Sequence, residues 1–433
     1  MSAVIIHLCC SWRRAISRLG GKIGKKFAHV FATNSIPMHK SVLLYISLFF
    51  AVTLSAQSPG NTKNITLPSK DSFRTIELFF LTPEKQLLYY QNAEKILSTN
   101  KIEAGTKKHR LVEAPADLSG ISFKFKDTVR TMNDFIYDTK AVGIIVLKND
   151  TILLEKYNGI EQNSKWINFS VAKSVTSLLY GAAIQDGYIR SLDQKVTQFI
   201  HELKGSAYDS VSLRDLLQMS SGIAWNDDVR DRESDLVKVG RLEATQGWPA
   251  IAKYLSQLKP AAAPGTKFNY NTIETNLAAL ALYRAIGKPL ATYLSEKIWK
   301  PFGMHADANW VKSRSLGIEL GGCCISASLR DYALLGLFAL NNGVDLDGRQ
   351  VVAPGWIKES TTSSRSNPGY GYYWWLSSSR RYFATGAFGQ QVEIDPSQRI
   401  IVAIQSYWPT AFSDYYVGYI DAMFEAINSK LKK

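Results

Sequence analysis

The feature that most constrains the fold is the position of the strand-forming segments, which lie on both sides of a long helix-forming region. Residues 142–148 and 151–157 are rich in β-branched side chains, and the two-residue Asn149-Asp150 turn between them is typical of a β-hairpin. Strand patterns return at 371–376, 382–384, 391–394 and 400–405. We therefore expect a single antiparallel sheet assembled from both ends of a domain.

The region between these strands is predicted to be mostly helical. Helices are expected at 174–186, 213–219, 248–258 and 276–286, and further ones at 127–135, 331–341 and 415–430. The pattern predicts an α/β fold of the α+β kind, in which an antiparallel sheet is flanked by terminal helices and carries an inserted, mostly helical lobe. Ahead of this region we expect a strand at 73–81 and a helix at 83–97.

The N-terminal region has the pattern of an export signal. In residues 38–56 a short basic start is followed by an apolar run and then by small residues, as in a secretory signal peptide. We expect a periplasmic or secreted protein, with no stable membrane span after cleavage because the apolar run is shorter than the ~20 residues that cross a bilayer. Residues 1–37 are interpreted as an upstream extension. A membrane anchor and an organelle transit peptide are the alternatives.

Composition argues against several other classes of protein. The net charge is +14, but seven of the basic residues lie before residue 57, where acidic residues are absent, and they account for half of the excess. The remaining basic residues are spread along the chain, so we expect no nucleic-acid binding. The adjacent Cys323 and Cys324 are predicted to be packing residues rather than a disulfide framework. His109, His201 and His305 are widely separated, so we expect no metal and no cofactor.

The Ser170-x-x-Lys173 segment is the strongest candidate for chemistry. In a helix, positions i and i+3 share a face, so a hydroxyl and an amine would lie side by side. A lysine amine can accept a proton from serine only if its pKa falls below the usual ~10.4. The same spacing occurs in three other places, at 98–101, 256–259 and 429–432. The spacing alone therefore does not decide which serine reacts.

Two later segments could complete such a site. Tyr270 follows a turn at 264–265, and a phenol close to a lysine can be held as a phenolate or can relay a proton to a leaving group. Thr385 and Gly386 belong to a predicted strand in which glycine would let a substrate approach the backbone. Each of these residues alone could equally be structural.

Together, the three segments resemble the penicillin-recognising serine hydrolases, the superfamily of class C β-lactamases, DD-peptidases and related esterases and amidases. The resemblance covers about residues 130–428 and is also carried by 216–223, 321–327, 330–331 and 369–375. It implies a β-lactamase/transpeptidase-like fold. It also implies a serine hydrolase domain over 118–428, preceded by a segment at 57–117 without an assigned role.

The departures from the β-lactamase pattern narrow the expected substrate. Thr272 stands where that group has asparagine, and Ala384 stands where it has a lysine or histidine before Thr-Gly. A cation at that place would bind the carboxylate of a β-lactam or of a peptide C-terminus. The sequence is more similar to the 6-aminohexanoate-dimer hydrolases and related carboxylesterases. This likeness predicts a small ester or linear amide as the substrate.

The resemblance also implies roles for individual residues. Ser170 would attack the carbonyl group, Lys173 would take the serine proton, and Tyr270 would protonate the leaving group. The backbone N–H groups of Ser170 and Ala387 would form the oxyanion hole. The residues expected to bind the substrate are Thr272, Thr385, Gly386, Gln390 and Trp225.

Three alternatives remain open at this point. The protein could be a β-lactamase or DD-peptidase that acts on cell-wall peptides, or a catalytically silent binding protein on the same fold. A Ser-His-Asp mechanism is the competing chemistry, although the sequence lacks a Gly-x-Ser-x-Gly motif. The sequence does not predict the oligomeric state.

Overall fold

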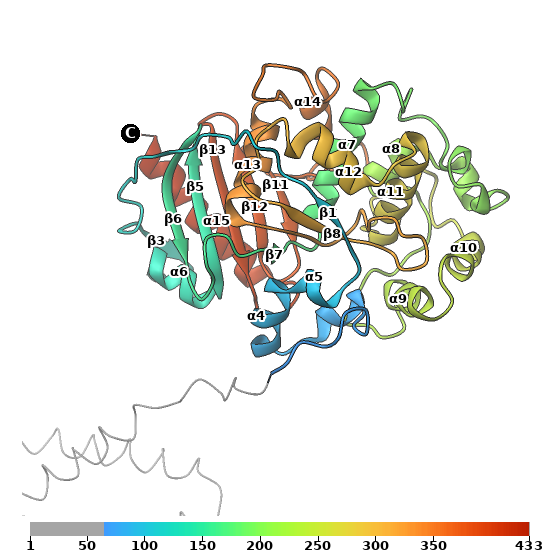
Figure 1. Ribbon diagram of the computed structural model, residues 1–433, viewed down its shortest axis with the longest axis horizontal. Helices are drawn as coiled ribbons and strands as arrows, with labels where there is room; N and C mark the ends of the chain where they lie inside the picture. The colour runs from blue at the N-terminus through green and yellow to red at the C-terminus, as the bar shows by residue number, and fades with distance from the viewer. Residues whose placement is uncertain (1–64, 433) are drawn as a thin grey trace, which may run out of the picture. The chain divides into compact units, whose positions relative to one another are not determined.

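The computed structural model describes residues 65–432, and the predictions for residues 1–56 lie outside this part of the chain. Its main sheet has seven strands in the order β10-β11-β12-β13-β5-β6-β2 (Figure 1). Neighbouring strands are antiparallel, except that β2 runs parallel to β6. The strands are β2 (Val112–Glu113), β5 (Ala141–Lys148), β6 (Thr151–Tyr157), β10 (Trp375–Leu376), β11 (Tyr382–Gly386), β12 (Gln390–Asp395) and β13 (Ile400–Ser406).

The centre of this sheet joins the two ends of the domain, because β5 pairs with β13. Ile145 and Ala403 face one hydrophobic core, and their neighbours Val146 and Val402 face the other. One helix packs on each face, which explains why both strands are apolar along their whole length. The two helices are α13 (Leu329–Leu340) and α15 (Asp414–Leu431). This arrangement confirms the predicted sheet flanked by helices.

The inserted lobe is mostly helical, as predicted, and lies beside the β10 end of the sheet (Figure 1). Its helices are α7 (Val171–Gln185), α8 (Leu213–Leu217), α9 (Asp235–Thr245), α10 (Trp248–Gln257), α11 (Thr272–Ile286) and α12 (Leu290–Leu294). Short helical turns connect them: η3 (Val196–Gln198), η4 (His201–Leu203), η5 (Ala207–Ser210) and η6 (Ser295–Trp299). All the helices that we expected in this lobe are present, whereas α9 and α12 were not predicted.

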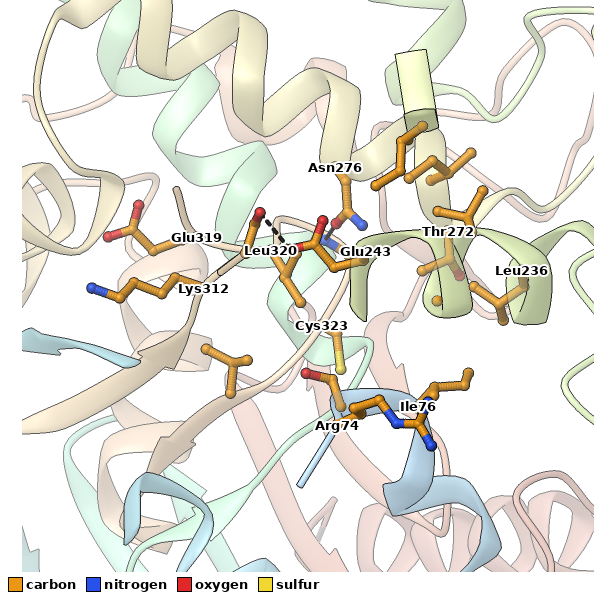
Figure 2. Close-up of a pocket in the computed structure, with 18 of the residues that line it drawn as sticks. Arg74, Ile76, Leu236, Glu243, Thr272, Asn276, Lys312, Glu319, Leu320 and Cys323 are labelled. Carbon is orange, nitrogen blue, oxygen red and sulfur yellow. Dashed lines mark hydrogen bonds between the residues drawn. The ribbon is translucent and has the colours of Figure 1, made fainter. Parts of the chain in front are cut away.

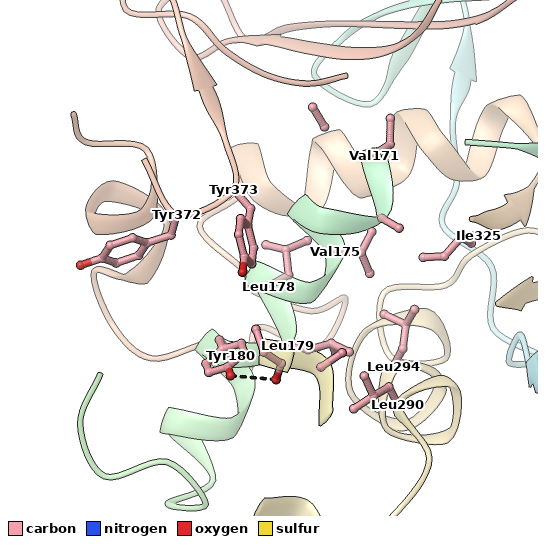
Figure 3. Packing of buried hydrophobic residues seen from close by; sticks show 14 of the residues in the cluster. Val171, Val175, Leu178, Leu179, Tyr180, Leu290, Leu294, Ile325, Tyr372 and Tyr373 are labelled. Atoms are coloured by element: carbon pink, nitrogen blue, oxygen red, sulfur yellow. Dashed lines mark hydrogen bonds between the residues drawn. The ribbon is translucent and has the colours of Figure 1, made fainter. Parts of the chain in front are cut away.

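Helix α7 runs through the interior of the lobe and is buried along most of its length (Figure 3). Val175 and Leu179 pack among side chains from α12 and β9, including Leu294. The hydroxyl of Tyr180 donates a hydrogen bond of 2.9 Å to the carbonyl oxygen of Ala278 in α11. The helix is therefore fixed on several sides by apolar packing and by a buried hydrogen bond.

Two smaller sheets and several short helices complete the described part. The four-stranded sheet has the order β1-β8-β9-β7, with β1 (Thr99–Ile102), β7 (Trp166–Ile167), β8 (Ala308–Val311) and β9 (Ile325–Ala327). The two-stranded sheet consists of β3 (Ser122–Phe125) and β4 (Thr128–Thr131). The remaining helices are η2 (Thr75–Phe80), α4 (Pro83–Gln91), α5 (Ala93–Ile96), α6 (Met132–Asp138) and α14 (Trp356–Ser360).

Three local predictions were wrong or misplaced. The strand expected at 73–81 is the 3-10 helix η2, where the side chain of Glu77 accepts a hydrogen bond from the backbone N–H of Arg74 at 2.6 Å and caps the first turn. The helix expected at 127–135 begins only at residue 132, after strand β4. Of 371–376, only the last two residues form a strand, because the N–H of Gly371 bonds to the carbonyl of Trp374 in a tight turn.

Residues 65–117 pack onto the rest of the described chain through the two larger sheets. Strand β1 pairs with β8, and β2 pairs with β6. Within residues 65–432, no helix combines the length and the apolar character needed to cross a membrane. In the same residues, His, Cys, Asp and Glu side chains do not gather in a group that could hold a metal ion.

Candidate active site

Ser170 is presented by a strained turn between β7 and α7. The side-chain oxygen of Asn168 accepts a hydrogen bond from the N–H of Ile325, which ties the end of β7 to β9. Phe169 then adopts a left-handed φ of 47°, an uncommon conformation for a bulky residue. Helix α7 begins immediately after Ser170. Ser170 is partly exposed, whereas residues 171–183 are all buried.

The amine of Lys173 lies beside the Ser170 hydroxyl. Lys173 Nζ is 3.2 Å from Ser170 Oγ, 3.3 Å from Thr272 Oγ1 and 2.7 Å from the carbonyl oxygen of Gly322. The side chain is buried, with 2% of its surface exposed. Burial lowers the pKa of Lys173 to about 8, although the nearby carboxylate of Asp227 opposes part of this shift. With that pKa, about a tenth of the amine is neutral at pH 7, compared with fewer than about one in a thousand for an ordinary lysine.

Burial distinguishes this serine–lysine pair from the three others of the same spacing. Lys101, Lys259 and Lys432 are all exposed to solvent. Lys101 also forms an ion pair with Asp307 at 2.8 Å, and this contact stabilises its charged form. Only at Lys173 does the environment favour the neutral amine that a general base requires.

Tyr270 lies just ahead of α11, close to both Lys173 and Ser170. Lys173 Nζ is 5.1 Å from the centroid of its ring, and the ring stacks on Trp375 at 6.0 Å. Burial raises the pKa of Tyr270 well above its usual value, and the neighbouring Ser170 hydroxyl offsets only part of that rise. Of the two states that the sequence left open, this environment favours the neutral phenol, which can donate a proton.

Asp227 is a residue that sequence reasoning missed. Its carboxylate accepts hydrogen bonds from the N–H and the hydroxyl of Thr272, both at 2.8 Å, and from the indole N–H of Trp225 at 2.7 Å. The hydroxyl oxygen of Thr272 in turn accepts a hydrogen bond from the amine of Lys173. Burial raises the pKa of Asp227, and the Lys173 amine opposes that rise. No spacing motif marks Asp227, because it reaches Lys173 only through the folded chain.

The end of strand β11 lies against Ser170. A Cβ atom added to Gly386 would be 2.2 Å from the carbonyl oxygen of Asn168 and 3.1 Å from the backbone nitrogen of Ser170. Only glycine allows so close an approach. Phe388, two residues further on, packs against Phe169 with ring centroids 5.3 Å apart. The turn that contains Ala387 is therefore held beside the start of α7.

Three of the residues that we expected to bind substrate make hydrogen bonds within the protein that support the site. Trp225 is buried, and its indole supports Asp227. Gln390 is also buried, and its amide donates to the carbonyl oxygens of Ala387, at 3.2 Å, and of Phe388 and Ser406. The hydroxyl of Thr385 donates to the backbone of Gln390 at 3.4 Å. These three side chains brace the site through bonds within the protein, and the sequence pattern did not distinguish such residues from those that face the cleft.

The loop before β9 supplies the third partner of Lys173 through close packing on α11. A Cβ atom on Gly322 would be 2.8 Å from the carbonyl oxygen of Thr272, and the N–H of Gly322 donates to the side chain of Asn276 at 2.9 Å. The next two residues, Cys323 and Cys324, are joined as a vicinal disulfide. This corrects the expectation that they are only packing residues. Cys324 has a left-handed φ of 83°. In an extended chain the side chains of two successive residues would point to opposite faces, and this φ avoids that arrangement.

Ser170, Asp227, Tyr270 and Thr272 open into one cleft, with a volume of about 180 Å³ (Figure 2). The cleft runs between η2, α9, α11 and the segment 311–323. His109, His201 and His305 are not among the residues that line it. The site can therefore offer a hydroxyl nucleophile, a buried amine and a phenol to a bound substrate, without a histidine.

Comparison with known proteins agrees with this geometry. Residues 125–414 match the model of the beta-lactamase family, which is more than half of the chain. The chain belongs to the beta-lactamase family. This membership and the fold confirm the resemblance inferred from the sequence.

Individual known proteins are also similar to this chain in sequence or in fold. The chain is 28% identical over 306 residues to a 6-aminohexanoate-dimer hydrolase of Paenarthrobacter ureafaciens, a match that covers 65% of this chain and 76% of the relative. A solved structure described as “Putative 6-aminohexanoate-dimer hydrolase from Bacillus anthracis” has a TM-score of 0.74 and 22% identity, covering 85% of this chain and 99% of that one. An octameric penicillin-binding protein homologue from Pyrococcus abyssi has a TM-score of 0.54 and 17% identity, covering 70% and 76%. The chain is thus a hydrolase of the β-lactamase fold, related to 6-aminohexanoate-dimer hydrolase.

Proposed function

We propose that this protein is a serine hydrolase that cleaves an ester or a small linear amide through an acyl-enzyme. The observation that carries the proposal is the buried amine of Lys173, 3.2 Å from the partly exposed hydroxyl of Ser170. An amine with a pKa of about 8 can accept a proton near neutral pH, and an ordinary lysine cannot.

In the acylation step, Lys173 takes the proton of Ser170 while the hydroxyl oxygen attacks the substrate carbonyl carbon. The negative oxygen that forms accepts hydrogen bonds from the backbone N–H groups of Ser170 and Ala387. Each such donor contributes roughly 3 kcal/mol in other hydrolases. As the tetrahedral intermediate collapses, Tyr270 gives its proton to the leaving alcohol or amine and recovers one from Lys173.

Water then completes the reaction by the reverse route. The Lys173–Tyr270 pair removes a proton from water, and the resulting hydroxide attacks the acyl carbon. The bond between that carbon and Ser170 Oγ breaks, and the serine oxygen regains a proton. The acid product leaves, and the enzyme returns to its starting state.

Two observations favour esters and linear amides over β-lactams. Ala384 carries no charge with which to bind a carboxylate beside Ser170, and it is buried on β11. The relative from Paenarthrobacter ureafaciens is named for the hydrolysis of a dimer of 6-aminohexanoate, which is a linear amide.

A hydrolysis screen with the purified full chain tests this function. We expect turnover of p-nitrophenyl esters or linear amides that is lost in Ser170→Ala, and much slower turnover of nitrocefin. Nitrocefin turnover equal to that of the ester would favour a β-lactamase. Absence of any Ser170-dependent hydrolysis, together with no labelling by a fluorophosphonate, would favour a silent binding protein.

A further inference from the structure

The cleft continues well beyond Ser170 and has mainly apolar walls. Its side chains come from the N-terminal segment, the inserted lobe, the segment before β9 and, at Phe412, the loop between β13 and α15 (Figure 2). Representative lining residues are Phe73, Ile76, Leu236, Val239, Leu277 and Leu316. A carbonyl group held at Ser170 would therefore have a long apolar channel next to it.

One wall of this channel is built by η2, in the segment to which the sequence assigned no role. Arg314 donates a hydrogen bond of 3.1 Å to the carbonyl oxygen of Phe73 and a further one to the carbonyl oxygen of Asp71. On the other side, Ile76 faces α9 at Gly240, where an added Cβ atom would be 3.3 Å from Ile76. The N-terminal segment is thus fastened across the cleft, and its side chains limit the width.

Charged groups in the walls, both acidic and basic, already have partners within the protein. Glu243 accepts hydrogen bonds from the hydroxyls of Ser313 and Ser315 at 2.7 and 2.9 Å. Arg74, at the rim, pairs with Glu77 at 3.3 Å. Because these charges are held by neighbouring groups, they do not offer an open site for a charged end of a substrate.

On the β8 side of the cleft, the charged side chains also have hydrogen-bond partners within the protein. Glu319 accepts hydrogen bonds from the N–H groups of Leu290 and Ala291 at 2.9 and 3.0 Å, and from the side chain of Asn100 at 2.8 Å. Lys312 donates to the same Asn100 side chain at 2.9 Å. Most of the other surface that this side offers to a ligand is hydrocarbon, from Val311, Leu316, Ile318 and Leu320.

We propose that this channel binds an unbranched, uncharged hydrocarbon chain of the substrate, so that the enzyme prefers esters or amides with a medium-length alkyl arm. This inference rests on the proposed function, since it places the cleaved bond at Ser170. A charged chain end would lose its hydration in the channel without gaining a partner, and this is costly. The N-terminal segment is then a determinant of specificity.

Two ester series measure the preference directly. One series consists of p-nitrophenyl acetate, butyrate, hexanoate and octanoate, and the other of acetate esters with alcohols of matching lengths. In at least one series, kcat/KM should rise by about threefold to fourfold for each methylene until the channel is full. A flat or falling response in both series would overturn the proposal.

Chain charge gives a second readout on the same enzyme. The p-nitrophenyl monoester of adipic acid, with a terminal carboxylate, should react at least about tenfold more slowly than the hexanoate. The p-nitrophenyl ester of 6-aminohexanoate should be disfavoured in the same direction. Equal or faster hydrolysis of both charged esters would contradict an uncharged-chain site.

Substitutions in two walls of the channel test whether the channel causes the dependence of kcat/KM on chain length. Ile76→Trp narrows it from η2, and Leu236→Trp narrows it from α9; each should lower the ratio of octanoate to acetate kcat/KM by about tenfold. Phe80→Trp is the matched control, because Phe80 is in the same 3-10 helix but is 54% exposed and outside the cleft. An unchanged ratio in both wall variants that melt like the wild type would overturn the proposal.

The two hypotheses fail in different ways. If no ester is hydrolysed in a Ser170-dependent manner, the proposed function fails. If esters are hydrolysed without regard to chain length or chain charge, the function stands and only the channel assignment fails.

Discussion

The charged form of Lys173 lies in a place where water cannot stabilise it. Its three hydrogen-bond partners, Ser170, Thr272 and the carbonyl of Gly322, are all uncharged groups. The nearest carboxylate, Asp227, lies beyond Thr272 and compensates only in part. The local balance of burial against charge therefore lowers the pKa of this one lysine and makes it suitable as a base.

The pH dependence of ester hydrolysis follows from this balance. Only the neutral amine can accept a proton, so kcat/KM should rise about tenfold per pH unit below the pKa of about 8 and level off above it. The measurement is kcat/KM for a p-nitrophenyl ester across this range. A rate that is flat, or that falls as the pH rises through 8, would contradict Lys173 as the base.

Asp227 is predicted to act as a positioning residue through Thr272. Asp227→Asn removes a negative charge that raises the pKa of Lys173, so the rising limb of the pH profile should move to lower pH. We also expect kcat to fall by about tenfold to a hundredfold, since Thr272 loses a charged acceptor. Asp227→Glu should restore part of the activity. A loss of kcat without any shift of the profile would indicate a purely structural role.

At the scale of elements, the approach of β11 to the start of α7 is the most demanding contact. Gly386→Ala places a methyl group 2.2 Å from the carbonyl oxygen of Asn168, so strand and turn must separate. A displacement of about 1 Å can cost about a hundredfold in kcat, and we expect a loss of that order. Gly418→Ala is the control, because its added Cβ would meet only a side-chain atom of Phe125 at 3.6 Å. Full activity of Gly386→Ala would show that the contact does not define the site.

Helix α11 carries a buried carboxyl group, that of Glu274, whose contribution to the stability of the fold depends on pH. Glu274 is fully buried, and burial raises the pKa of its carboxyl from 4.5 to about 8, an effect that the neighbouring Ser221 offsets only in part. A raised folded-state pKa stabilises the protein below the unfolded pKa, and this contribution is lost as the pH rises through the folded value. The free energy of unfolding should therefore fall by about 1.4 kcal/mol per pH unit between those two values.

The variant Glu274→Gln should remove this slope. The difference in unfolding free energy between variant and wild type should grow with pH across the same window, as measured by urea denaturation. The control is Glu161→Gln on the exposed surface, which should run parallel to the wild type. Parallel curves for Glu274→Gln would contradict a buried, neutral acid.

Local signals predicted some elements well and others poorly, for physical reasons. The hairpin of β5 and β6 could be predicted, because its apolar runs and its turn at Asn149 are encoded in adjacent residues. The β-rich segment at 73–81 instead forms η2, since the Glu77 cap and packing against α9 outweigh its propensity. Strand β10 is short because it begins only after Tyr373, which takes a left-handed φ of 60°, a feature of the folded turn that propensity does not reveal.

At the scale of the whole molecule, the site joins parts of the chain that are far apart in sequence. The closeness of Ser170 and Lys173 could be predicted because Ser170 immediately precedes the helix that carries Lys173, and the closeness of Tyr270 because the family resemblance implies it. The placement of Asp227, the bracing role of Gln390 and the wall formed by η2 depend on tertiary contacts. Such residues carry no local pattern, so the sequence alone could not assign them.

The central claim is that Ser170 is the nucleophile and that the buried amine of Lys173 activates it. Intact-mass and peptide-mapping mass spectrometry of the full chain treated with a fluorophosphonate tests this directly. The claim predicts a single adduct on Ser170, absent in Ser170→Ala and formed about a hundredfold more slowly in a folded Lys173→Met variant. An adduct on another residue, or equal labelling rates in wild type and Lys173→Met, would contradict it.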